Sequence, residues 1–401
     1  MGGPYSNGGF VSGAAPRALI IGDSPADAIA LRDALQRADG RSRIYQTDTL
    51  LAGLDRLAAG DIDLVLFDLA VSDGEGLEGL RALRTYAPAV PVVVLMATDQ
   101  DSNALRARQG GAEDCLVRGK IDSERIARVL QRLASKPAAR GDDEAAKRAT
   151  VVGLVGSKGG VGTTTVACNL SIELKNLGGG RVLLMDLDMH ANVIGFLMKT
   201  ESKHALLEAA NSIMRLDETR WRDLVTHGEG GLDIMPSGGP ACREEHMPRV
   251  ERLGCLLRFI RPQYDWIVID LGRLTPTTVR LCAELSQVLV VSSLEAAALN
   301  GVLGVARGLR EAGMQEVRLA VNRTPKVPEL SQAEVEKLVG VPVEAMLPEC
   351  EMQFKEAMSA RQLLGHSRQF SSQIAPLARR LAGAAEETNQ KKLFGLFRRR
   401  A

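Results

Sequence analysis

Short, mainly apolar runs alternate with segments of helical periodicity along two long stretches of this chain, and this alternation limits the possible folds more than any other feature. In the first stretch the runs are 18–21, 64–67 and 92–95, and in the second they are 151–155, 182–185, 232–235, 266–269, 288–291 and 317–321. Strand-like runs separated by amphipathic helices are typical of parallel sheets covered on both faces. The sequence therefore predicts an α/β protein with two doubly wound, three-layer α/β/α domains, over residues 17–135 and 150–385.

Three further segments lack the alternation. Residues 1–16 contain Gly, Ser and Pro but no basic start followed by an apolar run, so we expect a disordered tail and no secretion signal. Residues 136–149 are charged and Ala-rich, which predicts a linker, and residues 386–401 form a basic tail. Because no run reaches the roughly 18 apolar residues of a membrane span, we expect a cytoplasmic protein, at most attached to a membrane surface.

Composition excludes several classes of function. The formal net charge is +1 and aromatic residues make up 3% of the chain, so neither electrostatics nor base stacking favours a specific nucleic acid partner. The six cysteines are scattered, with no CxxC pair and no histidine at metal-ligand spacing. Reduced thiols are therefore expected instead of a metal or disulfide framework.

A glycine-rich loop follows the predicted strand 151–155 and precedes a helix that runs to about Leu177. In such a loop, backbone N–H groups converge on a phosphate and the helix N-terminus adds its dipole. The usual P-loop has a lysine directly after its last glycine and then a Ser or Thr for Mg²⁺. Here Thr163 takes the lysine position and Thr164 keeps the hydroxyl. Losing one charge-assisted contact of about 1.5–3 kcal/mol weakens nucleotide binding by roughly one to two orders of magnitude. The loop residues, all predicted to bind nucleotide, are Ser157, Lys158, Gly159, Gly160, Val161, Gly162, Thr163, Thr164 and Thr165.

This loop resembles the deviant Walker A motif of the MinD/ParA superfamily, and the resemblance covers most of residues 150–385. It implies ATP and Mg²⁺ as cofactors and a homodimer in which Lys158 reaches the partner's phosphates. Four further motifs follow in the family's order at strand ends, where ligands bind in open α/β sheets. The resemblance implies that Lys158 and Asp188 are catalytic, with Asp188 positioning the attacking water near Mg²⁺. It also implies that Thr164, Asp270 and Asp188 form the metal site, and that Asn322, Arg323 and Pro348 contact adenine. The alternatives are a capping role for Asp188 and a loop-ordering role for Asp186.

Residues 17 to about 133 resemble a response-regulator receiver. Asp23 matches its acidic turn, and Asp68 matches the phospho-accepting aspartate. Three positions depart from the pattern: Gly22 removes one metal-binding carboxylate, Met96 replaces the switch Ser or Thr, and Arg118 replaces the active-site lysine. Phosphorylation requires Mg²⁺ held by clustered carboxylates. The sequence therefore favours a degenerate receiver used for docking or dimerisation over a working phospho-switch.

The C-terminal segment KKLFGLFRRR places Leu393, Phe394, Leu396 and Phe397 within one arc of a helical wheel. Such a basic amphipathic helix can lie on an anionic membrane surface. MinD-like proteins also carry a C-terminal amphipathic anchor. A solvated tail or a peptide that docks on a partner protein is the alternative.

A degenerate receiver followed by a MinD/ParA-like ATPase without the second P-loop lysine resembles the TadZ/CpaE family. The resemblance implies a localisation and assembly factor for the Flp-type (tight adherence) pilus machine, polar and peripheral to the inner membrane. It would act as an ATP-dependent dimeric scaffold with weak ATPase activity that recruits the TadA/CpaF-like secretion ATPase and other pilus assembly proteins. Three alternatives remain: a MinD-like spatial regulator of division or flagellar placement with genuine ATPase cycling, a ParA-like partition protein with a basic DNA-binding face, and an iron–sulfur or metal-insertion ATPase with paired cysteines.

Overall fold

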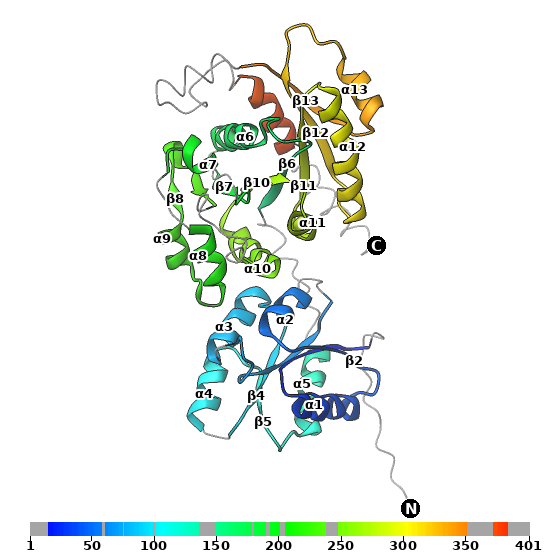
Figure 1. The fold of residues 1–401 in the computed structure, drawn as a ribbon. Coiled ribbons are helices and arrows are strands. Elements are labelled where there is room, and N and C mark those ends of the chain that lie inside the picture. Colours follow the sequence, from blue (N-terminus) through cyan, green and yellow to red (C-terminus); the bar gives the residue numbers. More distant parts are fainter. Residues whose placement is uncertain are drawn as a thin grey trace, which may run out of the picture. The chain divides into compact units, whose positions relative to one another are not determined.

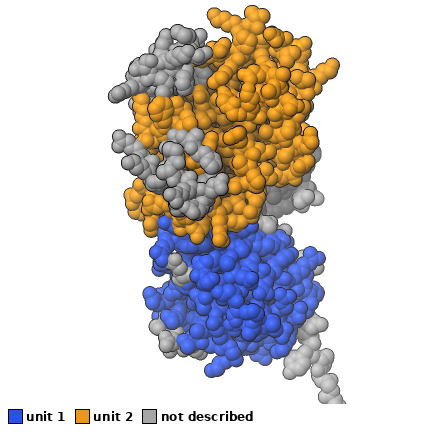
Figure 2. Space-filling model, viewed as in Figure 1, with its two compact units in different colours: residues 1–146, 212–215 blue, residues 147–211, 216–401 orange. Residues whose placement is uncertain are grey.

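The computed structural model describes residues 15–57, 61–74, 76–98, 101–135, 149–178, 180–189, 193–200, 205–237, 248–350 and 372–383. The chain forms two compact units, drawn in separate colours in Figure 2. Unit 1 comprises residues 1–146 and 212–215, and unit 2 comprises residues 147–211 and 216–401. The predicted tails 1–16 and 386–401 and the linker 136–149 lie outside the described residues, apart from residues 15, 16 and 149.

Unit 1 is built on a five-stranded parallel sheet with the strand order β2-β1-β3-β4-β5. The bounds are β1 (Arg17–Ile21), β2 (Arg43–Thr47), β3 (Leu64–Asp68), β4 (Val92–Met96) and β5 (Asp114–Val117). Strands β3 and β4 are buried over their whole length, which explains why they read as continuous aliphatic runs. The chain direction across the sheet reverses at β1, so the loops after β1 and β3 meet at a topological switch point.

Five helices cover the two faces of this sheet. Their bounds are α1 (Pro25–Ala38), α2 (Leu50–Leu57), α3 (Leu77–Tyr86), α4 (Asp101–Gln109) and α5 (Ser123–Ser135). Helix α1 begins where Ser24 accepts a hydrogen bond from the Asp27 N–H, with Pro25 in the first turn. Helices α1 and α5 share one hydrophobic core with the sheet, and α2, α3 and α4 lie on the other face (Figure 1).

Unit 2 is built on an eight-stranded sheet with the order β13-β12-β11-β6-β10-β7-β9-β8. All pairings are parallel except that of β8 with β9. The bounds are β6 (Thr150–Gly156), β7 (Val182–Asp186), β8 (Thr226–His227), β9 (Asp233–Met235), β10 (Trp266–Arg273), β11 (Gln287–Ser292), β12 (Val317–Thr324) and β13 (Val343–Pro348). The central position of β6 brings the carboxyl ends of β11, β10 and β7 around the loop that follows it.

Helix α6 and a helix over residues 372–383 cover one face of this sheet, where their buried side chains share a single core. Figure 1 shows α10 and α11 on the opposite side of the sheet from α6. The helix bounds are α6 (Thr163–Gly178), α7 (Val193–Leu197), α8 (Ala205–Asn211), α9 (Glu218–Leu224), α10 (Val250–Ile260), α11 (Pro276–Leu281), α12 (Ala296–Glu311) and α13 (Gln332–Val339). The two layered units confirm the predicted fold class.

Candidate functional site

The loop between β6 and α6 is shaped by two glycines whose backbone angles disfavour other residues. Gly160 has a φ of 81° and Gly162 a φ of 93°, in the left-handed region where a side chain is strained. A Cβ atom on Gly162 would also lie 2.4 Å from the amide nitrogen of Asn322. Helix α6 begins directly after this turn, so the loop N–H groups and the helix N-terminus are adjacent. The backbone therefore has the shape that a phosphate-binding loop needs.

Strand β11 and helix α12 hold the start of this loop. The Ser157 N–H donates to the Val291 carbonyl oxygen at 2.9 Å, and the Ser157 hydroxyl donates to the Ser292 hydroxyl at 3.0 Å. A Cβ atom on Gly301 would lie 2.3 Å from the Ser157 carbonyl oxygen, so α12 approaches the loop as only glycine allows. Sequence reasoning missed Ser292 and Gly301. A polar residue closing a buried strand was the available signal for Ser292.

Lys158 and Thr163, the two positions that distinguish this loop from the usual P-loop, have different surroundings. Lys158 is part-exposed and forms an ion pair with Glu295, which immediately precedes α12. This contact lowers the pKa of the Glu295 carboxyl. Thr163 is buried, and its hydroxyl lies 2.7 Å from the point where a Cβ on Gly156 would stand. The only lysine in the loop is thus engaged within the same chain, and the position after the last glycine carries no charge.

Thr164, in the first turn of α6, and Asp270, within β10 and three residues before its end, come together as the two residues predicted to hold a metal. Burial raises the pKa of the Asp270 carboxyl, while the Thr164 side chain and the Gly272 N–H oppose this rise. The Gly272 N–H donates to Asp270 Oδ1 at 3.0 Å, whereas Asp270 Oδ2 is buried without a well-formed hydrogen bond among the described residues. An unsatisfied buried carboxylate oxygen beside a hydroxyl suits a hard divalent cation such as Mg²⁺.

Asp186 is the last residue of β7 and pairs in register with Asp270, and Asp188 lies two residues beyond the strand. Asp188 is half-buried, and its N–H donates to Asp186 Oδ1 at 2.9 Å. Asp186 itself is buried and accepts a hydrogen bond from the Ser237 hydroxyl at 3.2 Å. Burial, with the nearby Asp270 charge as a second cause, raises the pKa of Asp186 to about 8. Within the described residues no trio of acidic, His or Cys side chains forms a metal cage, so Mg²⁺ here would also depend on phosphate oxygens and water.

The raised pKa of Asp186 predicts a pH-dependent stability for the metal-free protein. The folded state keeps a proton that the unfolded state releases near pH 3.8, so stability falls as pH rises from there to about 8. The slope from one such group is at most about 1.4 kcal/mol per pH unit. Asp186→Asn should therefore raise the thermal unfolding temperature in EDTA, by more at about pH 8 than at about pH 5. An equal difference from wild type at both pH values would contradict the raised pKa.

The three residues predicted to contact adenine lie at the carboxyl ends of β12 and β13. Asn322 is buried, and its amide donates to the Val161 carbonyl oxygen at 2.9 Å, so it also supports the glycine-rich loop. Arg323 is exposed and has a φ of 55°, an uncommon conformation for a residue with a side chain. Pro348 is half-buried and pairs in register with Thr324. The structure thus gathers Asn322 with the loop and places Arg323 and Pro348 on neighbouring strand ends.

In unit 1, acidic side chains lie at the carboxyl ends of β1 and β3, at that unit's own switch point. Asp68 is buried; its Oδ1 accepts from the Ala70 N–H at 2.9 Å, and its Oδ2 contacts Arg118 Nη2 at 2.5 Å. The same guanidinium lies 3.3 Å from Asp27 Oδ2. Asp23 Oδ2 accepts from the Ser72 N–H at 3.2 Å. Both Asp68 oxygens are therefore engaged, and Arg118 supplies positive charge where a receiver would hold its cation and phosphoryl group.

Gly22 and Met96 are the other two positions at which this unit departs from the receiver pattern. A Cβ atom on Gly22 would stand 3.1 Å from Asp68 Cβ, so an acidic residue at position 22 would face Asp68, and Met96 is buried.

We therefore expect no phosphoryl transfer from acetyl phosphate to wild-type protein. The double variant Gly22→Asp with Arg118→Lys should gain Mg²⁺-dependent labelling, because it adds a carboxylate and removes the guanidinium fork. Phosphate-affinity electrophoresis measures the phosphorylation of wild type and of the double variant. The control is the double variant with Asp68→Asn added, which should not be labelled. Labelling of wild type at Asp68 would contradict the expectation.

The C-terminal tail, with Leu393, Phe394, Leu396 and Phe397, lies outside the described residues. Its predicted membrane or protein contact stays a prediction. Of the helices that the structure describes, none has both the length and the apolar composition to cross a bilayer.

Comparison with known proteins finds a similar family model for part of each unit. Residues 18–131 match the response regulator receiver domain, and residues 149–322 match the AAA domain. The KDP operon transcriptional regulatory protein KdpE of Escherichia coli (strain K12) is 41% identical over 98 residues, which are 24% of this chain and 42% of KdpE. The antiactivator FleN of Pseudomonas aeruginosa is 27% identical over 176 residues, 43% of this chain and 61% of FleN. The chain thus spans less than two thirds of the length of either relative.

Two solved structures share the fold of the P-loop unit. A ParA family ATPase from Chlorobium tepidum TLS aligns with a TM-score of 0.51 at 24% identity, covering 58% of this chain and 98% of that one. The septum site-determining protein MinD from Pyrococcus horikoshii OT3, complexed with Mg-ADP, aligns with a TM-score of 0.50 at 20% identity. The alignment covers 59% of this chain and 97% of that one. At these identities the likeness shows the fold alone. The chain therefore combines a receiver domain with a MinD/ParA-like P-loop domain, and the predicted resemblance is confirmed at that level.

Proposed function

We propose that unit 2 binds Mg·ATP at the carboxyl ends of β6, β7 and β10. The observation that carries this is the buried Asp270 carboxylate, which lies beside Thr164 at the start of α6 and whose Oδ2 has no well-formed hydrogen bond to any residue that the structure describes. A buried charge of this kind is costly unless a cation completes its surroundings. Residues 157–165 would hold the phosphates through their backbone, and Thr164, Asp270 and Asp188 would face the metal. Mg²⁺ supplies charge neutralisation at the phosphate oxygens when bound.

We propose further that hydrolysis is weak. The transition state of phosphoryl transfer accumulates charge on the phosphate oxygens, and Thr163 places no positive group there. Lys158 remains as the loop lysine, but its ion pair with Glu295 must open before it can reach any phosphate. Asp188 would orient water. In this proposal, nucleotide binding stabilises a dimer, and ATP is hydrolysed slowly.

For the cellular role we propose an assembly and localisation factor of the TadZ/CpaE kind, working on the Flp-type pilus machine at the inner membrane. The pairing of two departures supports this proposal: the receiver-like Asp68 is ion-paired with Arg118, and the P-loop lacks its second lysine. A protein with both is suited to hold partners in place, since neither unit has the charges of a fast switch. Its expected partners are a second copy, the secretion ATPase and other pilus assembly proteins.

The test is a deletion in the host bacterium, complemented with wild type or with Asp270→Asn. Loss of surface pili with normal division and flagellar number, together with copurification of the secretion ATPase by the wild type, is the expected result. Normal piliation in the deletion strain would rule out the pilus role while leaving nucleotide binding untouched.

A MinD-like spatial regulator is the second candidate, favoured by the likeness to the antiactivator FleN and by the MinD fold of unit 2. In that case the same deletion strain should show misplaced septa or altered flagellar number. Purified protein should then also turn over ATP in repeated cycles, which the uncharged Thr163 position argues against.

A further inference from the structure

Arg273, the last residue of β10, lies beside the start of the glycine-rich loop of unit 2. β10 pairs with β6 in parallel, and the register places Arg273 opposite Gly156, the last residue of β6. Paired strands lie about 4.8 Å apart, so the two backbones are neighbours where the loop begins. A Cβ atom on Gly156 would also lie only 3.4 Å from the Gly272 carbonyl oxygen. The end of β10 therefore borders the loop that is proposed to hold the phosphates.

β10 contains one extra residue just before this point. Asp270 pairs in register with Leu154. Three residues later, Arg273 pairs with Gly156, which is only two residues beyond Leu154. Two residues of β10 therefore oppose one of β6, which is a β-bulge, and Gly272 has a left-handed φ of 62° within it. A bulge changes the direction of the side chains that follow it.

The bulge places Arg273 on the face of the sheet that α6 covers. Leu154 belongs to the core shared with α6, and Gly156 stands two residues further along β6, on the same face. A Cβ atom on Gly156 would lie 2.7 Å from the hydroxyl oxygen of Thr163, the first residue of α6. Residues paired in register share a face, so Arg273 lies on the side of Thr163. Without the extra residue, alternation along β10 would place Arg273 on the opposite face from Asp270.

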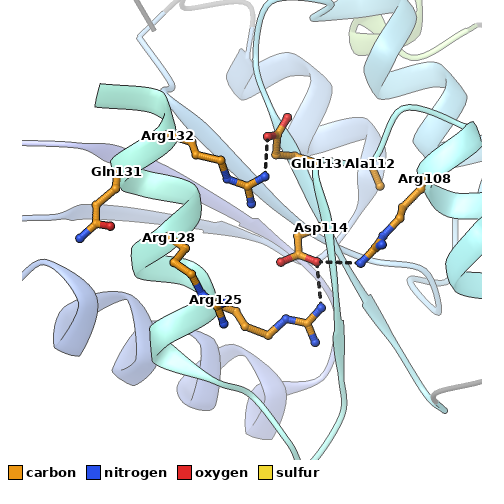
Figure 3. Close-up of a pocket in the computed structure, with 8 residues that line it drawn as sticks. All are labelled: Arg108, Ala112, Glu113, Asp114, Arg125, Arg128, Gln131 and Arg132. Atoms are coloured by element: carbon orange, nitrogen blue, oxygen red, sulfur yellow. Dashed lines mark hydrogen bonds and ion pairs between the residues drawn. The ribbon is translucent and has the colours of Figure 1, made fainter. Parts of the chain in front are cut away.

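The positive charge of Arg273 is not neutralised by a carboxylate. Arg273 is exposed, and in the described part of the chain its guanidinium group forms no hydrogen bond or ion pair. Other arginines of the protein differ in this respect. Arg108 and Arg125, beside an open pocket of unit 1, both contact the Asp114 carboxylate (Figure 3). Arg273 therefore keeps a charge that an anion at the loop can use.

The loop lacks a positive charge of its own at the usual position. Thr163 stands where the usual P-loop has its lysine, and Lys158 forms an ion pair with Glu295. A guanidinium group can replace such a contact, because its planar fork binds phosphate oxygens through two parallel hydrogen bonds. The long side chain of Arg273 starts on the face of Thr163, next to the loop, so it is placed to make this contact.

The strand order indicates which phosphate Arg273 would contact. β10 lies on one side of β6, whereas β12 and β13, where adenine is proposed to bind, lie on the other. The phosphate end of the nucleotide would therefore extend toward β10. Asp270, the proposed metal ligand, stands on β10, and the metal in P-loop proteins bridges the β- and γ-phosphates. A Cβ atom on Gly272 would lie 2.9 Å from Asp188 Cγ, so the proposed water-orienting residue also lies at this strand end.

We propose that Arg273 binds the terminal phosphate of the ATP held by this loop, and that it thereby makes unit 2 selective for ATP over ADP. The inference rests on the proposed Mg·ATP site. Arg273 partly replaces the contact that the P-loop lysine usually makes, and it does so from a strand end instead of from the loop.

The test compares the full-length wild type with Arg273→Gln by calorimetry, using ADP and the non-hydrolysable ATP analogue AMP-PNP, both with Mg²⁺. Arg273→Gln should weaken AMP-PNP binding by about 10- to 100-fold, because one charge-assisted contact is lost. It should leave the affinity for ADP unchanged, because ADP has no terminal phosphate at this position. Arg273→Lys, which keeps the charge and loses the fork, should fall between Arg273→Gln and wild type for AMP-PNP.

The matched control is Arg307→Gln on α12, where the arginine is also exposed and has no partner within the described residues. It should bind both nucleotides like wild type, and all variants should unfold at the wild-type temperature because both arginines are exposed. Equal AMP-PNP affinity of Arg273→Gln and wild type would overturn the role of Arg273 and leave the proposed site intact. An equal loss of affinity for ADP and AMP-PNP would also overturn it, since the terminal phosphate would not be involved. Failure of the wild type to bind either nucleotide would instead refute the Mg·ATP site itself, and this inference with it.

Discussion

Replacing Asp270 by asparagine should weaken Mg²⁺-dependent ATP binding by about 10- to 100-fold, the cost usually found when the groups around a bound metal are changed. The metal-free variant should unfold at the same temperature as wild type or a higher one. The reason is that the Asp270 carboxylate is buried, its pKa is raised by that burial, and its Oδ2 has no well-formed hydrogen bond within the described part of the chain. Removing this charge relieves a desolvation cost in the empty site and removes a ligand from the loaded one.

Weaker Mg·ATP binding together with unchanged or higher thermal stability would show that the variant has lost a metal ligand and has kept its fold. ATP affinity is measured by calorimetry with Mg²⁺ and with EDTA, and stability by thermal unfolding without nucleotide. Asp223→Asn, an exposed carboxylate on α9, is the matched control and should change neither quantity. If Asp270→Asn binds Mg·ATP as tightly as wild type, Asp270 is not at the metal site.

Thr163→Lys should tighten ATP binding by roughly one to two orders of magnitude and speed hydrolysis, because it adds a charge-assisted contact of about 1.5–3 kcal/mol at the first position of α6. Thr163 is buried at the base of the loop, with its hydroxyl close to Gly156, so the added side chain must extend along the loop toward the phosphates. A lysine at this position would also place positive charge where the transition state needs it.

Thr163→Met is the control for this substitution, since it adds similar length without charge. It should leave affinity unchanged or lower it. Titration of ATP with Mg²⁺ and a steady-state phosphate-release assay measure the two effects. Tightening by Thr163→Met equal to that by Thr163→Lys would show that packing, and not the missing charge, limits nucleotide binding.

The amino-acid sequence by itself determined the strands that lie inside the sheets. Strands β3, β4, β7 and β11 are buried on both faces, so each contains at least four consecutive apolar residues, with polar residues only at the strand ends. The sequence also determined the glycine-rich loop, because Gly160 and Gly162 adopt angles that other residues avoid. Asp270 could be located because it stands within a strand that is otherwise apolar up to that point.

The apolar runs in the sequence did not identify the strands at the sheet edges. β2 has no fully buried residue, and β13 is buried only at alternate positions. An edge strand pairs with one neighbour and faces solvent, so its sequence carries a weaker apolar signal. β5 was missed because it is only four residues long and begins with Asp114.

Only the tertiary structure decided which distant side chains meet. Lys158 pairs with Glu295, 137 residues later, and Asn322 reaches the loop carbonyl of Val161, 161 residues earlier. Arg118 likewise contacts both Asp27 and Asp68. Each contact follows from the order of strands in a sheet, which places the ends of sequence-distant strands side by side. That order is set by the packing of whole helices and strands, and local sequence patterns do not contain it.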